Sequence, residues 1–245
     1  MAFSRLYVSS ELQTGRQVQL DEDRTRYVGR VLRLRAGDAL SVFNGNDGEF
    51  AATIMSIGKL TATIVLGEQI VADTESSFKV HLVQGVSRGE RMDFVVQKAT
   101  ELGVKRISPV LTEFSVVKFD AGRAKKRRDH WRKVAESACE QSGRIRPPLI
   151  DLPVALNAWL GDKPKDADID LILEPGAPDA LAKIGAPETK VCVLVGPEGG
   201  FSPSEYEDAS IAGFTSVSLG PRTLRTETAA LAAITILQSR WGDMR

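Results

Sequence analysis

The sequence predicts an α/β protein of two parts, a small β-rich unit over residues 1–72 and a larger α/β unit over residues 73–245. In the first part, several short β-branched runs surround a single helical pattern, which suggests a small barrel. In the second part, strand-like and helical patterns alternate, which indicates a mostly parallel sheet covered by helices. The segment 73–77 is polar and poor in apolar residues, so it separates the two parts.

The first part is predicted to combine one helix with several strands. Apolar residues recur at helical spacing over Asp21–Leu34, with Asp21 as the N-cap and a turn at Ala36–Asp38 as the stop. A second turn, Asn44–Gly48, is rich in the residues that favour tight turns. The predicted strands are Arg5–Val8, Ala39–Phe43, Glu49–Ile57 and Leu60–Leu66.

The second part is predicted to alternate between strands and helices. The strands are Lys79–Val86, Arg106–Leu111, Ile169–Leu173, Val191–Val195 and Ser216–Leu219. The helices are Glu90–Leu102, Arg123–Ser142, Pro203–Ala212 and Thr226–Trp241. Within the last helix, Ala229–Leu237 is apolar on nearly every side. Such a helix is buried on several sides, either within the monomer or at a subunit interface.

Composition places the chain among ordinary globular proteins, with 42% hydrophobic and 26% charged residues. The N-terminal segment has no apolar core of a signal peptide, and no apolar run reaches the roughly 18 residues of a membrane span. The two cysteines are far apart, and with only two histidines a structural zinc cluster is not expected. We therefore expect a reducing, cytoplasmic location and no metal.

The net charge of zero hides a strong segregation of charge. Residues 24–35 contain five arginines and no acid, and residues 118–146 contain ten Lys/Arg against four Asp/Glu. Residues 147–219 reverse the balance, with four against twelve. This asymmetry suggests that one face of the protein contacts a polyanion, and a solvated helix face is the alternative interpretation.

A glycine-rich loop, Val195–Phe201, joins a predicted strand to a predicted helix. Its glycines permit close approach of the backbone, which can then offer N–H and C=O groups to a purine edge or a small anion. Ser202 can cap the helix that Pro203 begins. A tight turn without a ligand is the alternative interpretation. The carboxylate of Glu198 argues against it, because a tight turn does not require an acidic side chain between glycines. The phosphate-loop and dinucleotide-binding glycine patterns are both absent from the sequence.

A second loop, Leu219–Thr228, leads into the last helix and carries an ordered set of charges. Thr226 can cap that helix, and Glu227 then lies in its first turn, where the helix dipole favours an acid. Arg225 stands where the dipole is unfavourable to a cation. We therefore expect it to point at a negative group: Glu198, a carboxylate of a cofactor, or a phosphate.

Together with other segments, these loops resemble the bacterial 16S ribosomal RNA uridine-N3 methyltransferases, members of the SPOUT superfamily. The resemblance extends over essentially the whole chain. One departure is Phe114, which stands where such proteins often carry arginine. The matching segments are Tyr27–Arg33, Ser87–Asp93, Gln97-Lys98 with Thr100–Gly103, Glu140–Arg144, Gly196–Gly200, and Leu219–Arg222 with Leu224–Thr228.

The resemblance implies a PUA-like N-terminal barrel that binds RNA and a SPOUT-type α/β domain tied in a deep trefoil knot. It also implies S-adenosylmethionine as cofactor, a homodimer formed through the C-terminal domain, and 16S rRNA within the 30S subunit as substrate. The residues expected to hold the cofactor are Leu173, Glu174, Pro175, Val195, Gly196, Pro197, Glu198, Gly199, Gly200, Leu219, Gly220, Arg222, Thr223, Leu224 and Arg225.

Methylation of uridine N3 requires loss of the N3 proton and stabilisation of charge on the uracil oxygens. We expect Arg225 to position or stabilise the base or its phosphate, and Glu198 to organise Arg225 or the cofactor. A 2′-O-ribose methyltransferase and a non-catalytic ribosome-assembly factor are the alternatives. The candidates for contacts with RNA phosphates are Arg5, Arg24, Arg26, Arg30, Arg33 and Arg35.

Overall fold

The computed structural model describes residues 4–71, 74–115 and 120–244, which form two compact units. The first unit comprises residues 1–75 with 139–147, and the second comprises 76–138 with 148–245. Each unit has its own hydrophobic core. Among the described residues, no helix is long and apolar enough to cross a membrane.

The first unit is built on a five-stranded sheet with the order β1-β3-β4-β5-β2. β1 pairs parallel with β3, the other pairings are antiparallel, and β1 and β2 are the edge strands of this order. Residues such as Leu6, Val42 and Ile64 fill its core. The strands are β1 Ser4–Tyr7, β2 Gln17–Leu20, β3 Ala39–Phe43, β4 Glu49–Ile57 and β5 Ala62–Ile70.

Two details of this sheet differ from the sequence prediction. β2 was not predicted, because its four residues alternate glutamines with Val18 and Leu20 and resemble a polar loop. The last strand was predicted as Leu60–Leu66, but it begins two residues later and extends to Ile70, since pairing with β4 continues to its end. Sheet pairing, which the local pattern does not contain, determined both.

The predicted helix of this unit is shorter than its apolar pattern. α1 spans Glu22–Arg26, and Asp21 caps it as predicted by accepting from the backbone N–H of Arg24. A π-helical stretch, Tyr27–Val31, follows directly. The helical geometry then ends, and Arg33 adopts a positive φ of 56°. A residue in the left-handed region cannot continue a right-handed helix, so the helix stops before Leu34.

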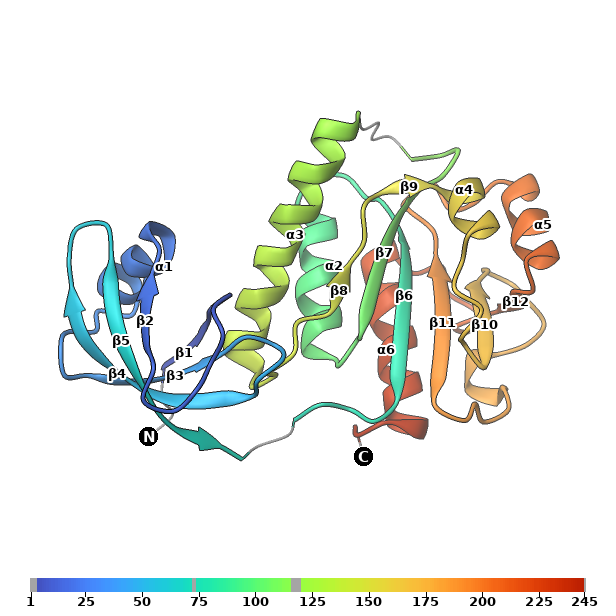
Figure 1. The fold of residues 1–245 in the computed structure, drawn as a ribbon. Helices are drawn as coiled ribbons and strands as arrows, with labels where there is room; N and C mark the ends of the chain where they lie inside the picture. The colour runs from blue at the N-terminus through green and yellow to red at the C-terminus, as the bar shows by residue number, and fades with distance from the viewer. Residues whose placement is uncertain (1–3, 72–73, 116–119, 245) are drawn as a thin grey trace. The chain divides into compact units, whose positions relative to one another are not determined.

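The second unit is a seven-stranded sheet with the order β12-β10-β11-β6-β7-β8, in which β9 also pairs with β7 (Figure 1). Every pairing is parallel, so all strands have their carboxyl ends at the same edge. The strands are β6 Lys79–Gly85, β7 Arg106–Leu111, β8 Leu149–Ile150, β9 Val154–Ala155, β10 Ile169–Leu173, β11 Lys190–Val195 and β12 Thr215–Val217.

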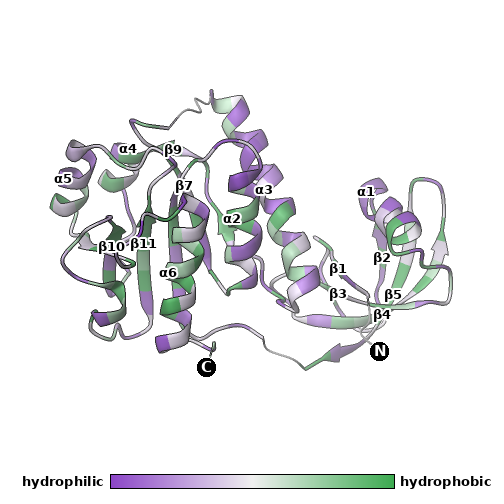
Figure 2. Cartoon of the chain, turned by 180° about the vertical axis from the view of Figure 1, so that it is seen from behind, coloured by the Kyte–Doolittle hydropathy of each residue, from purple (hydrophilic) through white to green (hydrophobic). Residues whose placement is uncertain are grey.

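Helices cover both faces of this sheet. Successive residues of β11 alternate between the two sides: Val193 packs with the core under α2, α3 and α6, and Leu194 packs with the core under α4 and α5. Figure 2 shows green, hydrophobic segments along the strands and on α2, α4 and α6. The helices are α2 Glu90–Glu101, α3 Ala121–Ser142, α4 Leu156–Gly161, α5 Pro203–Ile211 and α6 Thr226–Trp241.

The mostly parallel α/β architecture is confirmed, and most predicted boundaries agree to within two residues. β8, β9 and α4 were not predicted. The two strands are two residues long, too short to show a period, and six-residue α4 makes fewer than two turns.

The last helix, α6, lies where the chain returns from the edge strand β12 toward the centre of the sheet (Figure 1). It packs against β6, β11 and α2. Ala230, Ala233 and Leu237 are fully buried in this packing, whereas Leu231 and Ala232 stay partly exposed. Part of the apolar surface is therefore used within the monomer. The knot implied by the resemblance concerns this return path and stays a prediction.

Candidate active site

A cavity of about 600 Å³ lies at the carboxyl ends of β10, β11 and β12. Three loops form it: Leu173–Pro175 after β10, Val195–Phe201 after β11, and Leu219–Thr226 after β12. This is the edge where open α/β sheets bind ligands, and the volume suits a small molecule. All of the residues expected to hold the cofactor line the cavity. So do Arg91, Tyr206, Val217, Glu227 and Ala229, which had not been assigned to the cofactor site.

The glycine loop is folded too tightly to accept side chains. Gly200 has a φ of 70°, and its N–H donates to the carbonyl of Pro197 at 2.9 Å. A Cβ on Gly196 would lie 3.2 Å from the backbone of Gly200, and one on Gly199 would lie 2.7 Å from Cβ of Phe114. The glycines therefore let the loop curl around the cavity and leave its backbone uncovered. Ser202 caps α5 in a complete capping box, as predicted.

Thr226 joins the two loops. Its hydroxyl donates to the carbonyl oxygen of Gly196 at 2.6 Å and accepts from Nε2 of the buried Gln84 at 2.9 Å. The prediction that Thr226 caps α6 is therefore wrong. Arg225 occupies the N-cap position and makes no capping hydrogen bond with its side chain. The Thr226 hydroxyl instead ties the start of α6 to the glycine loop and to the end of β6.

Glu198 is held by the start of α2. Its Oε1 accepts from the Arg91 guanidinium at 2.6 Å and from the backbone N–H of Arg88 at 3.1 Å. Partial burial favours the neutral acid, but the backbone N–H of Glu198 itself, Arg91 and Arg88 outweigh it, so the pKa of Glu198 lies below its ordinary value. A pairing of Glu198 with Arg225, one of the three negative partners considered for Arg225, is not found among the described residues. Arg91 is the ion-pair partner of Glu198 instead, because α2 follows β6 and therefore begins at the same edge of the sheet as the glycine loop.

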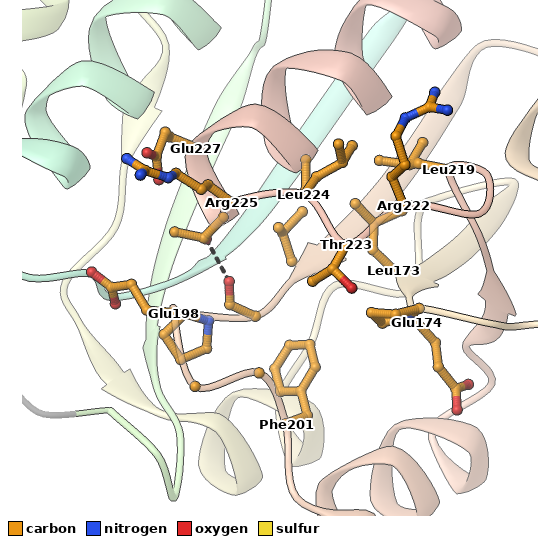
Figure 3. A pocket seen from close by; sticks show the side chains of 18 of the residues that line it. Leu173, Glu174, Glu198, Phe201, Leu219, Arg222, Thr223, Leu224, Arg225 and Glu227 are labelled. Atoms are coloured by element: carbon orange, nitrogen blue, oxygen red, sulfur yellow. Dashed lines mark hydrogen bonds between the residues drawn. The ribbon is translucent and has the colours of Figure 1, made fainter.

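Two arginines at the cavity have guanidinium groups free for a ligand. Arg225 and Arg222 are exposed, and no hydrogen bond or ion pair engages either within the described part of the chain. Figure 3 shows Glu198, Arg225 and Glu227 at one end of the cavity, and Arg222 and Leu219 at the other. One carboxylate oxygen of Glu227 is buried without a hydrogen-bond partner in the structure as described.

Neither histidine lines the cavity. His81 is 3% exposed in β6, and its Nε2 is 2.7 Å from Oγ of Ser108. Burial first, and then the charge of Arg106, lower the pKa of His81 to about 4. His130 lies on the surface of α3, where its Nε2 is 2.8 Å from Asp93. A histidine base is therefore not positioned at this cavity.

The six candidate RNA-binding arginines of the first unit fall into two groups. Arg5 is largely buried, pairs with Glu49 at 2.9 Å, and donates to the carbonyl oxygens of Cys139 and Arg144. Arg24 is half-buried and pairs with Glu140 at 2.9 Å. These two hold the unit together. The four exposed side chains are those of Arg26, Arg30, Arg33 and Arg35, of which Arg26 pairs with Glu22 on the surface.

Known RNA methyltransferases match this chain over nearly its whole length. Residues 74–238 match an RNA methyltransferase domain family, and residues 20–67 match an RNA methyltransferase PUA domain family. Ribosomal RNA small subunit methyltransferase E from Buchnera aphidicola is 35% identical, covering 98% of this chain and 97% of its own length. The enzyme of the same name from Rickettsia conorii is 32% identical, with 96% and 94% covered.

Two solved structures share the fold closely. Ribosomal RNA small subunit methyltransferase E from Neisseria gonorrhoeae, bound to S-adenosyl methionine, superposes with a TM-score of 0.91 at 36% identity, covering 99% of this chain and 100% of the other. A protein from Legionella pneumophila, in complex with the bound cofactor SAM, superposes with a TM-score of 0.94 at 37% identity, with 99% and 100% covered.

Proposed function

We propose, because the chain belongs to the ribosomal RNA small subunit methyltransferase E family, that it methylates a specific uridine at N3 in the 16S rRNA of the small ribosomal subunit. S-adenosylmethionine is the proposed methyl donor. The observation that carries this proposal is the cavity at the carboxyl edge of the parallel sheet, lined by the three loops that carry the family motifs. Relatives that share the fold at 36% and 37% identity bind the same cofactor.

The cavity has the composition that S-adenosylmethionine requires. Leu173, Val195 and Leu219 offer apolar surface, and the uncovered backbone of 196–200 offers N–H and C=O groups to the adenine and ribose. The guanidinium group of Arg222 can pair with its carboxylate. When bound, S-adenosylmethionine supplies an electrophilic methyl group on a sulfonium.

The target nitrogen lies on the Watson–Crick edge, so the uridine must be unpaired or flipped out of a helix to reach the cavity. Arg225 is the proposed catalytic residue. Its exposed guanidinium can hold the uracil oxygens or the adjacent phosphate and stabilise the negative charge that develops when the N3 proton leaves. Glu198 is ionised and held by Arg91, so its proposed part is to hold the glycine loop against α2.

RNA recognition is proposed for residues 1–72 and methyl transfer for residues 73–245. The family matches at 20–67 and 74–238 support this division. Of the candidate arginines, the exposed Arg30, Arg33 and Arg35 are available to phosphates, and Arg26 pairs only with Glu22 on the surface. Arg5 already uses its donors inside the unit. We further propose a homodimer through the C-terminal domain, supported by the apolar, partly exposed Leu231 and Ala232 of α6. A cytoplasmic location is proposed because ribosomes are the substrate.

Methyl transfer to unmodified small subunits tests the proposal. Tritium from labelled S-adenosylmethionine is followed into 30S subunits that lack the modification, and the labelled nucleoside is then identified. N3-methyluridine is the expected product. A labelled 2′-O-methyl nucleoside would show that the protein methylates the ribose hydroxyl and not N3 of the base. Cofactor binding without methyl transfer would favour a non-catalytic assembly factor. Light scattering on the purified protein measures the proposed dimer.

A further inference from the structure

The first half of α3 carries a dense positive charge that the proposed site does not use. Residues 121–133 contain seven Lys/Arg and a single acid, Asp129. Asp129 pairs with its neighbour Arg128 at 2.7 Å, and Arg123 pairs with Asp120 just before the helix. The other five bases are all exposed: Lys125, Lys126, Arg127, Arg132 and Lys133. No ion pair joins the first four of these to an acid in the described part of the chain.

The packing of α3 orients this charge outward. Ala124, Trp131 and Ala135 are buried against the second unit. The indole Nε1 of Trp131 donates to Oδ1 of Asp93 in α2 at 3.0 Å, which fixes the rotation of the helix. The bases occupy the remaining circumference over about 20 Å of helix length. Figure 2 shows the hydrophilic colouring of these turns.

The same contacts connect this surface to the mouth of the cavity. Arg91, in the first turn of α2, pairs with Glu198 of the glycine loop at 2.6 Å, and Asp93, two residues further, holds Trp131 of α3. α3 follows β7, so its first turns lie at the carboxyl edge of the sheet, where the cavity also lies. A polyanion that reached the cavity would pass close to this surface.

We propose that the exposed first turns of α3, with Lys125, Lys126, Arg127 and Arg132, form an RNA-docking surface that holds phosphates of the strand flanking the target uridine. The inference rests on the proposed function for the identity of the RNA. It differs from the arginines of the first unit, because it belongs to the domain that carries the cavity. Its role is to position the RNA backbone, which needs charge without base contacts.

The chemistry of the surface favours RNA over an acidic protein. A protein interface has a core of apolar and aromatic anchors. Within residues 121–133, no large apolar side chain is exposed, since Trp131 is 2% exposed. A surface with charge and no apolar anchor binds a phosphate backbone by counterion release, and its affinity depends steeply on salt.

The test compares two triple variants that lose the same charge. The first is Lys125→Gln, Lys126→Gln and Arg127→Gln on α3. The second removes three exposed lysines elsewhere in the second unit: Lys79→Gln, Lys165→Gln and Lys183→Gln. Filter binding of labelled unmodified 16S rRNA is measured without cofactor, over a series of salt concentrations from about 50 to 300 mM.

The α3 triple is expected to bind 16S rRNA roughly 10- to 100-fold more weakly at 150 mM salt, with a plot of log K against log salt flatter by about 2 to 3. The other triple should keep the wild-type slope. With 30S subunits, the α3 triple should raise KM and leave kcat and the affinity for S-adenosylmethionine unchanged. A wild-type salt slope in the α3 triple, or equal losses in both triples, would overturn the docking surface.

The outcome is separable from that of the proposed function. If the wild-type protein binds 16S rRNA and only the α3 triple loses affinity, the docking surface stands, even where no N3-methyluridine forms. If N3-methyluridine forms normally and the salt slope of the α3 triple equals that of wild type, the proposed function stands and the docking surface fails.

Discussion

Gly85, the last residue of β6, supports the glycine loop from behind, and Gly85→Ala should displace that loop. A Cβ at this position would lie 2.4 Å from Cδ and 2.5 Å from N of Pro197. Both atoms belong to the proline ring, so neither can rotate away. Since ordinary contact begins at 3.4 Å, the two backbones must separate by 3.4 − 2.4, or about 1 Å. The preceding residue, Gly196, would move with Pro197.

Overpacking of this kind costs about 1–3 kcal/mol. If the loop moves to relieve the strain, the backbone groups that bind the cofactor are misplaced, and the affinity for S-adenosylmethionine should fall roughly 5- to 150-fold. A misplacement of about 1 Å can also lower the rate of methyl transfer by roughly 100-fold. Titration calorimetry with S-adenosylmethionine and urea unfolding measure the two effects separately.

Gly161→Ala in α4 is the matched control. A Cβ there has no heavy atom within 4 Å, and Gly161 lies in a helix, where alanine is favoured over glycine. This variant should keep the wild-type affinity for cofactor and lose no stability. Wild-type cofactor affinity in Gly85→Ala would refute the reasoning, because it would show that the end of β6 does not hold the loop in place.

Three further predictions concern charge. Arg225→Ala should abolish methyl transfer while cofactor binding and the thermal unfolding midpoint stay near wild type, and a variant that turns over normally would remove the assigned role. Arg5→Ala leaves Glu49 buried without its partner and should cost about 3–5 kcal/mol in urea unfolding, whereas Arg33→Ala, at an exposed side chain, should cost almost nothing. Equal costs for the two would contradict the structural role of Arg5. The third is a dependence on pH: the pKa of His81 is about 4 in the folded chain, against 6.5 ordinarily. Below pH 6.5 the unfolded chain therefore binds a proton that the folded chain does not, and the free energy of unfolding should fall by about 3 kcal/mol in total as the pH drops to 4. His81→Gln should flatten this slope between pH 6.5 and 5, and an unchanged slope would show that His81 is not its source.

Strong local patterns predicted most of the second unit. Arg106–Leu111 and Thr226–Trp241 were predicted to the residue, because each is a mostly apolar segment that its own residues reveal. The cap expected at Thr226 was not part of what the structure confirmed. β8 and β9 have no such pattern, since each is a strand only because β7 is beside it. For the same reason β2 was missed in the first unit.

The candidate site divides in the same way. Its loops were recognised from glycines, prolines and charges within short segments, and all of the expected residues line one cavity. The residues that form hydrogen bonds and ion pairs with these loops could not be predicted from the loop segments themselves. Arg91 lies 107 residues before Glu198 in the chain, and Gln84 lies 142 residues before Thr226. The hydroxyl of Thr226, which was expected to cap α6, instead forms hydrogen bonds with Gly196 and Gln84.

By itself, the sequence determined the class of fold, the loops that carry the chemistry and the segregation of charge, because these depend on the period and composition of neighbouring residues. Only the tertiary structure decided which of those charges are free. In the folded chain Arg5 is buried in an ion pair with Glu49, and Glu198 pairs with Arg91. Arg225 remains exposed at the cavity. The physical reason is that the availability of a charged group depends on the partners and the burial that folding brings to it from distant parts of the chain.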